Sequence, residues 1–232
     1  MDTAIISKFE IVDTSTSWLS ATYALVKHTS GLLIHTWAMH ADYRAYGPYA
    51  ACNRMVRNLS VILQGEEAPY GDATHSRIFD VKGLLNTAVM QASLKKTEKE
   101  AIIVAGDFNS PSHLDWTNET KSQHCGWVVE WPVTKLMEDA EFLDSFREVF
   151  SNPATRPGKT WSPITKGSSE WDYALREPQD RIDFIFYQGP IQANNSARYA
   201  GSEPISRQPN CENNDWPSDH YAVWTDFVIV EK

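Results

Sequence analysis

Several features are scarce or missing in this 232-residue sequence. No apolar run approaches the roughly 18–20 residues that a membrane-spanning helix needs, so we expect no membrane span. Lys and Arg together number 21 against 30 Asp and Glu, which gives a net charge of −9. Proteins that hold nucleic acid non-specifically usually carry an excess of cations. The charge therefore argues against a processive or nonspecific nuclease.

Cysteine and linker sequences are also scarce. The three cysteines, Cys52, Cys125 and Cys211, show no CxxC spacing, which argues against a zinc site. Their odd number leaves at least one thiol unpaired in a monomer, the state we expect. The sequence contains no internal repeat, low-complexity tract or clear interdomain linker. We therefore expect a single domain over residues 1–232.

The hydrophobic pattern mixes strand and helix signals along the whole chain. Strands are predicted at 4–12, 18–28, 32–40, 101–105, 181–187 and 221–230. Helices are predicted after Pro48 and at 81–95, 134–140 and 143–149, whereas 151–180 and 188–217 read mainly as loops. Such a mixture predicts an α/β (α+β) fold in which two packed mixed β-sheets are flanked by helices.

The segment GDFN follows a short, β-branched apolar run typical of a buried strand. In an extended chain Asp107 and Asn109 would face the same side, and Gly106 would permit a close backbone approach. An aspartate can deprotonate or orient a water, and an asparagine amide can donate to a phosphoryl oxygen. A strand that ends in an Asx turn is the alternative interpretation, without any chemistry.

Two further segments carry polar groups beside predicted strands. Asp183 lies within RIDFIF, where a carboxylate among apolar neighbours needs a partner such as histidine. Otherwise this segment is an edge strand with Asp183 in solvent. Asp219 and His220 of SDH immediately precede the last strand. An aspartate suits a hard cation, and a histidine suits a phosphate or general acid–base work.

The order of GDFN, RIDFIF and SDH before a terminal strand resembles the C-terminal signature of the endonuclease/exonuclease/phosphatase superfamily, which has the deoxyribonuclease-I-like fold. The segment HTWAMHADYRAY at 35–46 is similar to the family strand that ends in an active-site histidine within N-x-H-L. That histidine would be His40. His35 is less suitable, because its opposite parity points it to the other face of a regular strand. The tyrosine-rich segment 41–49 after His40 is typical of a turn, and contact with substrate is the alternative interpretation.

The resemblance implies divalent-metal-dependent hydrolysis of a phosphoester, either a phosphodiester or a phosphomonoester, by in-line attack of an activated water. The cofactor would be Mg²⁺ or Mn²⁺, and Asp219 would belong to the metal site. Asp107 would position or activate the water, and Asn109 would hydrogen-bond the phosphate. The substrate stays open among a small phosphodiester, a nucleotide, a lipid head group and nucleic acid.

The resemblance also assigns roles to the histidines. His220 would contact the scissile phosphate and stabilise its developing charge. Asp183 would orient His220 and hold its tautomer. His40 would be a second histidine at the phosphate, although Ala38 stands where the family motif has asparagine.

Two family elements are not found: a first strand of the form T-x-N-I and a Q-E dipeptide whose glutamate is the main metal ligand. We therefore expect an N-terminally incomplete domain that lacks the first strands and binds magnesium more weakly. No signal-peptide pattern is visible, but this leaves the localisation open. A catalytically impaired family member that acts as a binding protein is the alternative. A weaker alternative is a carbohydrate-binding module, suggested by nine tryptophans.

Overall fold

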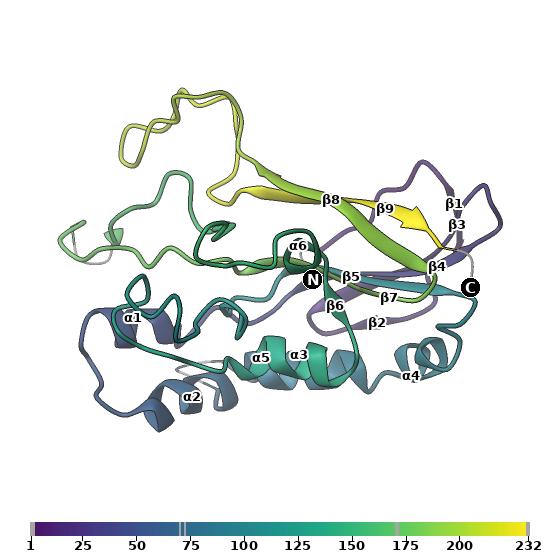
Figure 1. Cartoon of the computed structure of the whole chain (residues 1–232), viewed down its shortest axis with the longest axis horizontal. Helices are drawn as coiled ribbons and strands as arrows, with labels where there is room; N and C mark the ends of the chain where they lie inside the picture. Colours follow the sequence, from purple (N-terminus) through teal and green to yellow (C-terminus); the bar gives the residue numbers. More distant parts are fainter. Residues whose placement is uncertain (1–2, 70, 72, 170–171, 231–232) are drawn as a thin grey trace.

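The computed structural model describes residues 3–69, 71, 73–169 and 172–230 (Figure 1). The larger sheet has seven strands in the order β1-β3-β4-β5-β7-β6, with β2 paired to β3, and a second sheet contains β8 and β9. Strands β4 and β5 are parallel, whereas the other neighbours are antiparallel. The strands are β1 (Glu10–Asp13), β2 (Ser17–Trp18), β3 (Ala21–Lys27), β4 (Leu33–His40), β5 (Ala101–Asp107), β6 (Leu143–Asp144), β7 (Asp183–Gln188), β8 (Ile191–Tyr199) and β9 (Ala222–Ile229).

Helices α3, α4 and α5 and the second sheet cover opposite faces of the large sheet. Figure 1 shows α3, α4 and α5 below the sheet, β8 and β9 above it, and α6 between the two sheets. This arrangement confirms the predicted α/β fold with two sheets flanked by helices. None of the helices in the described part of the chain has the length and apolar character needed to cross a membrane. The helices are α1 (Gly47–Cys52), α2 (Leu59–Glu67), α3 (Arg77–Leu85), α4 (Ala88–Leu94), α5 (Pro132–Asp139) and α6 (Ser145–Val149).

Alternating side chains of the large sheet build two apolar layers. On the helix side, Trp37, Val104 and Phe184 belong to the main core, which also contains Val81 of α3 and Met137 of α5. On the other side a smaller cluster around Tyr187 and Ile191 packs against Phe227 of β9. The sheet is therefore buried on both faces, which explains the continuous apolar run at the start of β5.

Most predicted elements are found, but several boundaries were wrong. The helix expected at 81–95 is two helices, because Thr87 caps a new one by accepting from the Met90 amide. The stretch after Pro48 likewise divides into α1 and α2. The strand expected at 4–12 begins only at Glu10, and 18–28 divides into β2 and β3.

The segment 188–217, expected mainly as loop, contains the nine-residue strand β8. Its sequence, IQANNSARY, has little β-propensity. The strand forms because its backbone pairs with β9 along its whole length, with a bulge between Ala193 and Asn195. Tertiary pairing overrides the local preference here.

Gly106 lies where the backbone of β5 comes very close to that of β4. Its φ is +145°, and a Cβ added there would lie 1.8 Å from the Met39 carbonyl oxygen of β4. The close backbone approach predicted for this glycine is therefore present, and it directly precedes Asp107.

A disulfide joins Cys52, at the end of α1, to Cys125, 73 residues later. Cys211 is free, which agrees with the expected unpaired thiol. The bridge ties α1 to the loop that precedes α5.

Replacing Gly106 by alanine is expected to lower the free energy of unfolding by about 3 kcal/mol or more, because overpacking adds to an unfavourable φ. Urea denaturation measures the loss. Gly31→Ala is the control: its φ is also positive, +92°, but no atom lies within 4 Å of an added Cβ. The Gly31 variant should lose only about 1–2 kcal/mol. Equal losses in the two variants would contradict a steric role for Gly106.

The double variant Cys52→Ser, Cys125→Ser should lower the free energy of unfolding by about 2–4 kcal/mol, because the bridge closes a long loop in the unfolded chain. Urea titrations without reductant test this, with Cys211→Ser as the matched control. An unchanged urea midpoint in the double variant would show that the bridge does not stabilise the protein.

Candidate active site

Three neighbouring strands place polar side chains side by side. His40 at the end of β4 is paired with Asp107 at the end of β5, and Asp107 is paired with Asp183 at the start of β7. Paired residues in a sheet point to the same face, here the face toward β8 and β9. The Nε2 atom of His40 lies 3.8 Å from Asp107 Oδ2. Residues far apart in the sequence therefore converge at one end of the sheet.

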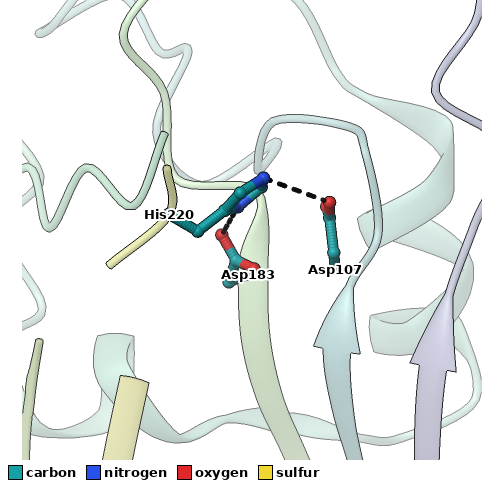
Figure 2. Close-up of side chains that lie close together, drawn as sticks. All are labelled: Asp107, Asp183 and His220. Carbon is teal, nitrogen blue, oxygen red and sulfur yellow. Dashed lines mark hydrogen bonds and ion pairs between the residues drawn. The ribbon is translucent and has the colours of Figure 1, made fainter. Parts of the chain in front are cut away.

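His220 enters from the loop before β9 and completes this group. Its Nδ1 lies 3.0 Å from Asp183 Oδ2, and its Nε2 lies 3.8 Å from Asp107 Oδ2 (Figure 2). The neighbouring amide of Tyr221 donates to the carbonyl of Thr160, and the His220 ring lies 4.7 Å from that of Trp161. Asp183 thus contacts the imidazole nitrogen opposite the one that faces Asp107.

Burial and mutual charge shift the acid–base behaviour of this group. Burial, reinforced by the Asp183 carboxylate, raises the pKa of Asp107 to about 7. Burial alone would lower the pKa of His220, but the hydrogen bond with Asp183 and the nearby carboxylates raise it to about 9. At neutral pH His220 is therefore an imidazolium ion, and Asp107 titrates in the physiological range.

Asn109 lies beside Asp107, but the two are not on one face of an extended strand, as the sequence predicted. The chain leaves the strand after Asp107, and Asn109 adopts a left-handed φ of 49°. Its backbone N–H donates to Asp107 Oδ1 over 2.7 Å. This contact is an Asx turn, the alternative interpretation of GDFN given above. Its side-chain Nδ2 donates to the Ala41 carbonyl over 2.8 Å. Asp107 and Asn109 nevertheless line the same cavity.

Arg77 holds the loop of Asn109, and the sequence pattern did not single it out. This arginine is 1% exposed. Its Nε donates to the Asn109 carbonyl over 2.6 Å, and its other nitrogens donate to the carbonyls of Tyr43, Arg44 and Gly65. Five N–H donors in a rigid fork can connect several loops at once. Its helix also contains Asp80 and Lys82, so nothing in the local sequence distinguishes Arg77.

A second buried arginine supports the strand of Asp183. Arg181 contacts Asp115 at 3.0 Å and Asp144 at 2.6 Å, and Arg147 contacts Asp115 at 2.7 Å. These side chains are all nearly inaccessible to solvent. Because each charge is paired and hydrogen-bonded, the network positions the chain two residues before Asp183.

The cavity at this site measures about 350 Å³ and has an aromatic wall. Tyr43, Tyr46, Tyr49 and Trp161 line it, together with His40, Asp107, Asn109, Glu177, Ile182, Asp219 and His220. The Tyr46 hydroxyl donates to Asp180 over 3.2 Å, and Tyr49 and Trp161 both donate to Glu177. The segment expected as a turn after His40 therefore leads into α1 and supplies part of the cavity wall.

Asp107, Asp183 and His220 could hold a metal ion. Each offers a ligand atom, and these atoms lie within 4.8 Å of one another. The two carboxylates are suitable ligands for Mg²⁺ or Mn²⁺, whereas the imidazole could bind a cation only after losing a proton. Asp219, the ligand expected from the sequence, lines the same cavity but is exposed and lies outside this cluster. His35 instead contacts Tyr23 and Glu100, and is buried away from the cavity lining.

The chain belongs to the Endonuclease/Exonuclease/phosphatase family, whose sequence model matches residues 2–220. Members of this family are phosphoesterases and nucleases, and they typically depend on a divalent metal. Phosphoester hydrolysis is thus the general chemistry associated with this family.

The chain is similar to known proteins over nearly its whole length. Uncharacterized protein F14F9.5 of Caenorhabditis elegans is 43% identical over 230 residues, which are 99% of this chain and 71% of that protein. A conserved protein of unknown function from Enterococcus faecalis V583 shares the fold, with a TM-score of 0.51, 16% identity, and coverage of 96% of this chain and 68% of its own. The mannosyl-6-phosphatase Bt3783 of Bacteroides thetaiotaomicron gives a TM-score of 0.47 and 14% identity, with coverage of 96% and 68%.

Asp183→Asn should lower the pKa of His220 from about 9 towards the ordinary histidine value, because the imidazolium loses its charged partner. An NMR titration of the His220 ring in metal-free protein measures this. Asp226→Asn, which removes an exposed carboxylate from β9, is the control and should leave the titration unchanged. If the Asp183 variant titrated like the wild type, the contact between Asp183 and His220 would not govern the imidazole.

Proposed function

We propose that this protein is a divalent-metal-dependent phosphoesterase whose active site is the cavity around Asp107, Asp183 and His220. The observation that carries the proposal is the meeting of these three side chains, from two strand ends and a distant loop, in one cluster whose Asp107 and His220 line the cavity. A chain of this family with such a cluster is suited to in-line attack of a water on a phosphoester.

Asp107 is proposed as the group that positions the attacking water and accepts its proton. Without a metal its pKa is about 7, so near neutral pH it is partly ionised and its carboxylate is basic enough to accept a proton. The proton leaves the water as its oxygen forms the new bond to phosphorus, and the ester oxygen departs with its electron pair.

His220 is proposed to stabilise the charge that develops on the phosphoryl oxygens. As an imidazolium held by Asp183, it presents an Nε2–H group toward the cavity. A charged donor fixed in place before the reaction needs no reorganisation as the charge forms. His40, on the other side of Asp107, is proposed as a second donor to the phosphate, and Asn109 as a neutral one through its side-chain amide.

A divalent cation fits the carboxylates of Asp107 and Asp183, and Asp219 is proposed as an additional carboxylate from the cavity rim. Two carboxylates beside one another repel, so a cation would relieve the cost of ionising both. When bound, the cation supplies Lewis-acid polarisation and a template for the phosphate. Carboxylates are ligands of both Mg²⁺ and Mn²⁺.

The test is the hydrolysis of bis(p-nitrophenyl) phosphate with and without Mg²⁺ or Mn²⁺. The wild type should require the metal, and His220→Ala should lower kcat by about a hundredfold or more, because a preorganised donor is lost. His28→Ala is the matched control, since His28 lies in the β3–β4 hairpin and contacts Ser30. Circular dichroism checks that each variant is folded. Folded wild type without turnover would overturn the proposal and favour a binding protein.

A further inference from the structure

A second cavity, of about 600 Å³, lies between α1 and α2. Alanine, glycine, valine, isoleucine, methionine and proline make up most of its lining, and no charged residue is among the described residues that line it. Gln64 and two tyrosines are its polar members. Val61 and Met55 are about half exposed, at 47% and 51%, and form part of its open side.

This apolar cavity shares a wall with the candidate active site. Tyr46 and Tyr49 line both cavities. Their rings lie 6.1 Å apart in an edge-to-face arrangement, and their hydroxyls are hydrogen-bonded to Asp180 and Glu177. Two anchored aromatic rings therefore separate a charged cavity from an uncharged one.

The difference in lining between the two cavities decides what each can bind. A phosphate would lose its hydration in the larger cavity without gaining a charged partner or a set of donors. An alkyl or aryl group gains from leaving water there, in proportion to the apolar area it buries. Binding sites for small molecules commonly combine such an apolar compartment with a few polar groups that fix orientation.

We propose that the cavity between α1 and α2 binds an apolar alkyl or aryl group attached to the phosphoester that is hydrolysed at the neighbouring site. This inference rests on the proposed function, and it deepens it by naming the substrate class. The phosphate lies against Asp107 and His220, and the organic substituent extends past Tyr46 and Tyr49 into the apolar cavity.

The experiment compares two substrates with the same leaving group and the same charge, methyl p-nitrophenyl phosphate and hexyl p-nitrophenyl phosphate. In the wild type kcat/KM for the hexyl ester should exceed that for the methyl ester by at least about tenfold, because the longer chain is buried. Val61→Asp should reduce this ratio by about tenfold or more. Ser60→Asp, which adds the same charge one residue earlier on α2, should leave the ratio unchanged, since Ser60 does not line the cavity.

A second variant of a cavity-lining residue distinguishes a loss of apolar binding from a loss of folding. Met55→Gln keeps the length of an exposed side chain but adds an amide, and it should lower the hexyl preference in a folded protein. Circular dichroism and the activity toward the methyl ester identify a variant that has lost its fold.

A binding measurement separates the two hypotheses. Isothermal titration calorimetry with methylphosphonate and hexylphosphonate reports affinity without turnover. If neither ester is hydrolysed, yet hexylphosphonate binds more tightly than methylphosphonate and Val61→Asp removes the difference, the apolar site stands and the proposed hydrolysis fails. If both esters are hydrolysed at equal rates and the phosphonates bind equally, the hydrolysis stands and the apolar site is overturned. A hexyl preference that Val61→Asp and Met55→Gln both leave intact would also overturn it.

Discussion

The pairing of β5 between β4 and β7 is the constraint on which the candidate site depends. It brings His40, Asp107 and Asp183 to one level at the end of the sheet, on the same face. Because side chains alternate along a strand, a slip of one residue would turn Asp107 toward the apolar core and bury an uncompensated carboxylate. Gly106 makes the crossing possible, since any side chain there would collide with the Met39 carbonyl.

Two buried arginines hold the loops next to these strands in place. Arg77 connects the loop of Asn109 with the residues that follow His40, and Arg181 holds the approach to β7 through Asp115 and Asp144. Burying a guanidinium charge is costly. Each arginine offsets this cost by donating several hydrogen bonds through its rigid guanidinium group. The loops that shape the cavity are therefore tied to the interior of the protein, so the polar groups of the site are positioned before any ligand arrives.

The two neighbouring cavities differ in the charge and polarity of their linings. One cavity contains carboxylates and an imidazolium whose pKa values depend on each other, and the other offers methyl, methylene and ring surfaces. Tyr46 and Tyr49 belong to both because a phenol has an apolar ring and a polar end. Their hydroxyls donate to Asp180 and Glu177, and the two residues line both cavities.

The sequence by itself determined the mixed α/β class, most strands of the large sheet and the segments that carry the polar site residues, because strand periodicity and short motifs are local properties. It also indicated the partnership of Asp183 with a histidine, since a carboxylate in an apolar strand needs one. Only the tertiary structure decided that β8 is a strand and that Asn109, whose side chain donates to the Ala41 carbonyl, lies at the cavity. Only the tertiary structure revealed the role of Arg77 and the cavity lining contributed by Tyr46, Tyr49 and Glu177. It also showed that the cluster of Asp107, Asp183 and His220 does not include Asp219. Each of these depends on contacts between segments tens of residues apart, and periodicity along the chain carries no information about such contacts.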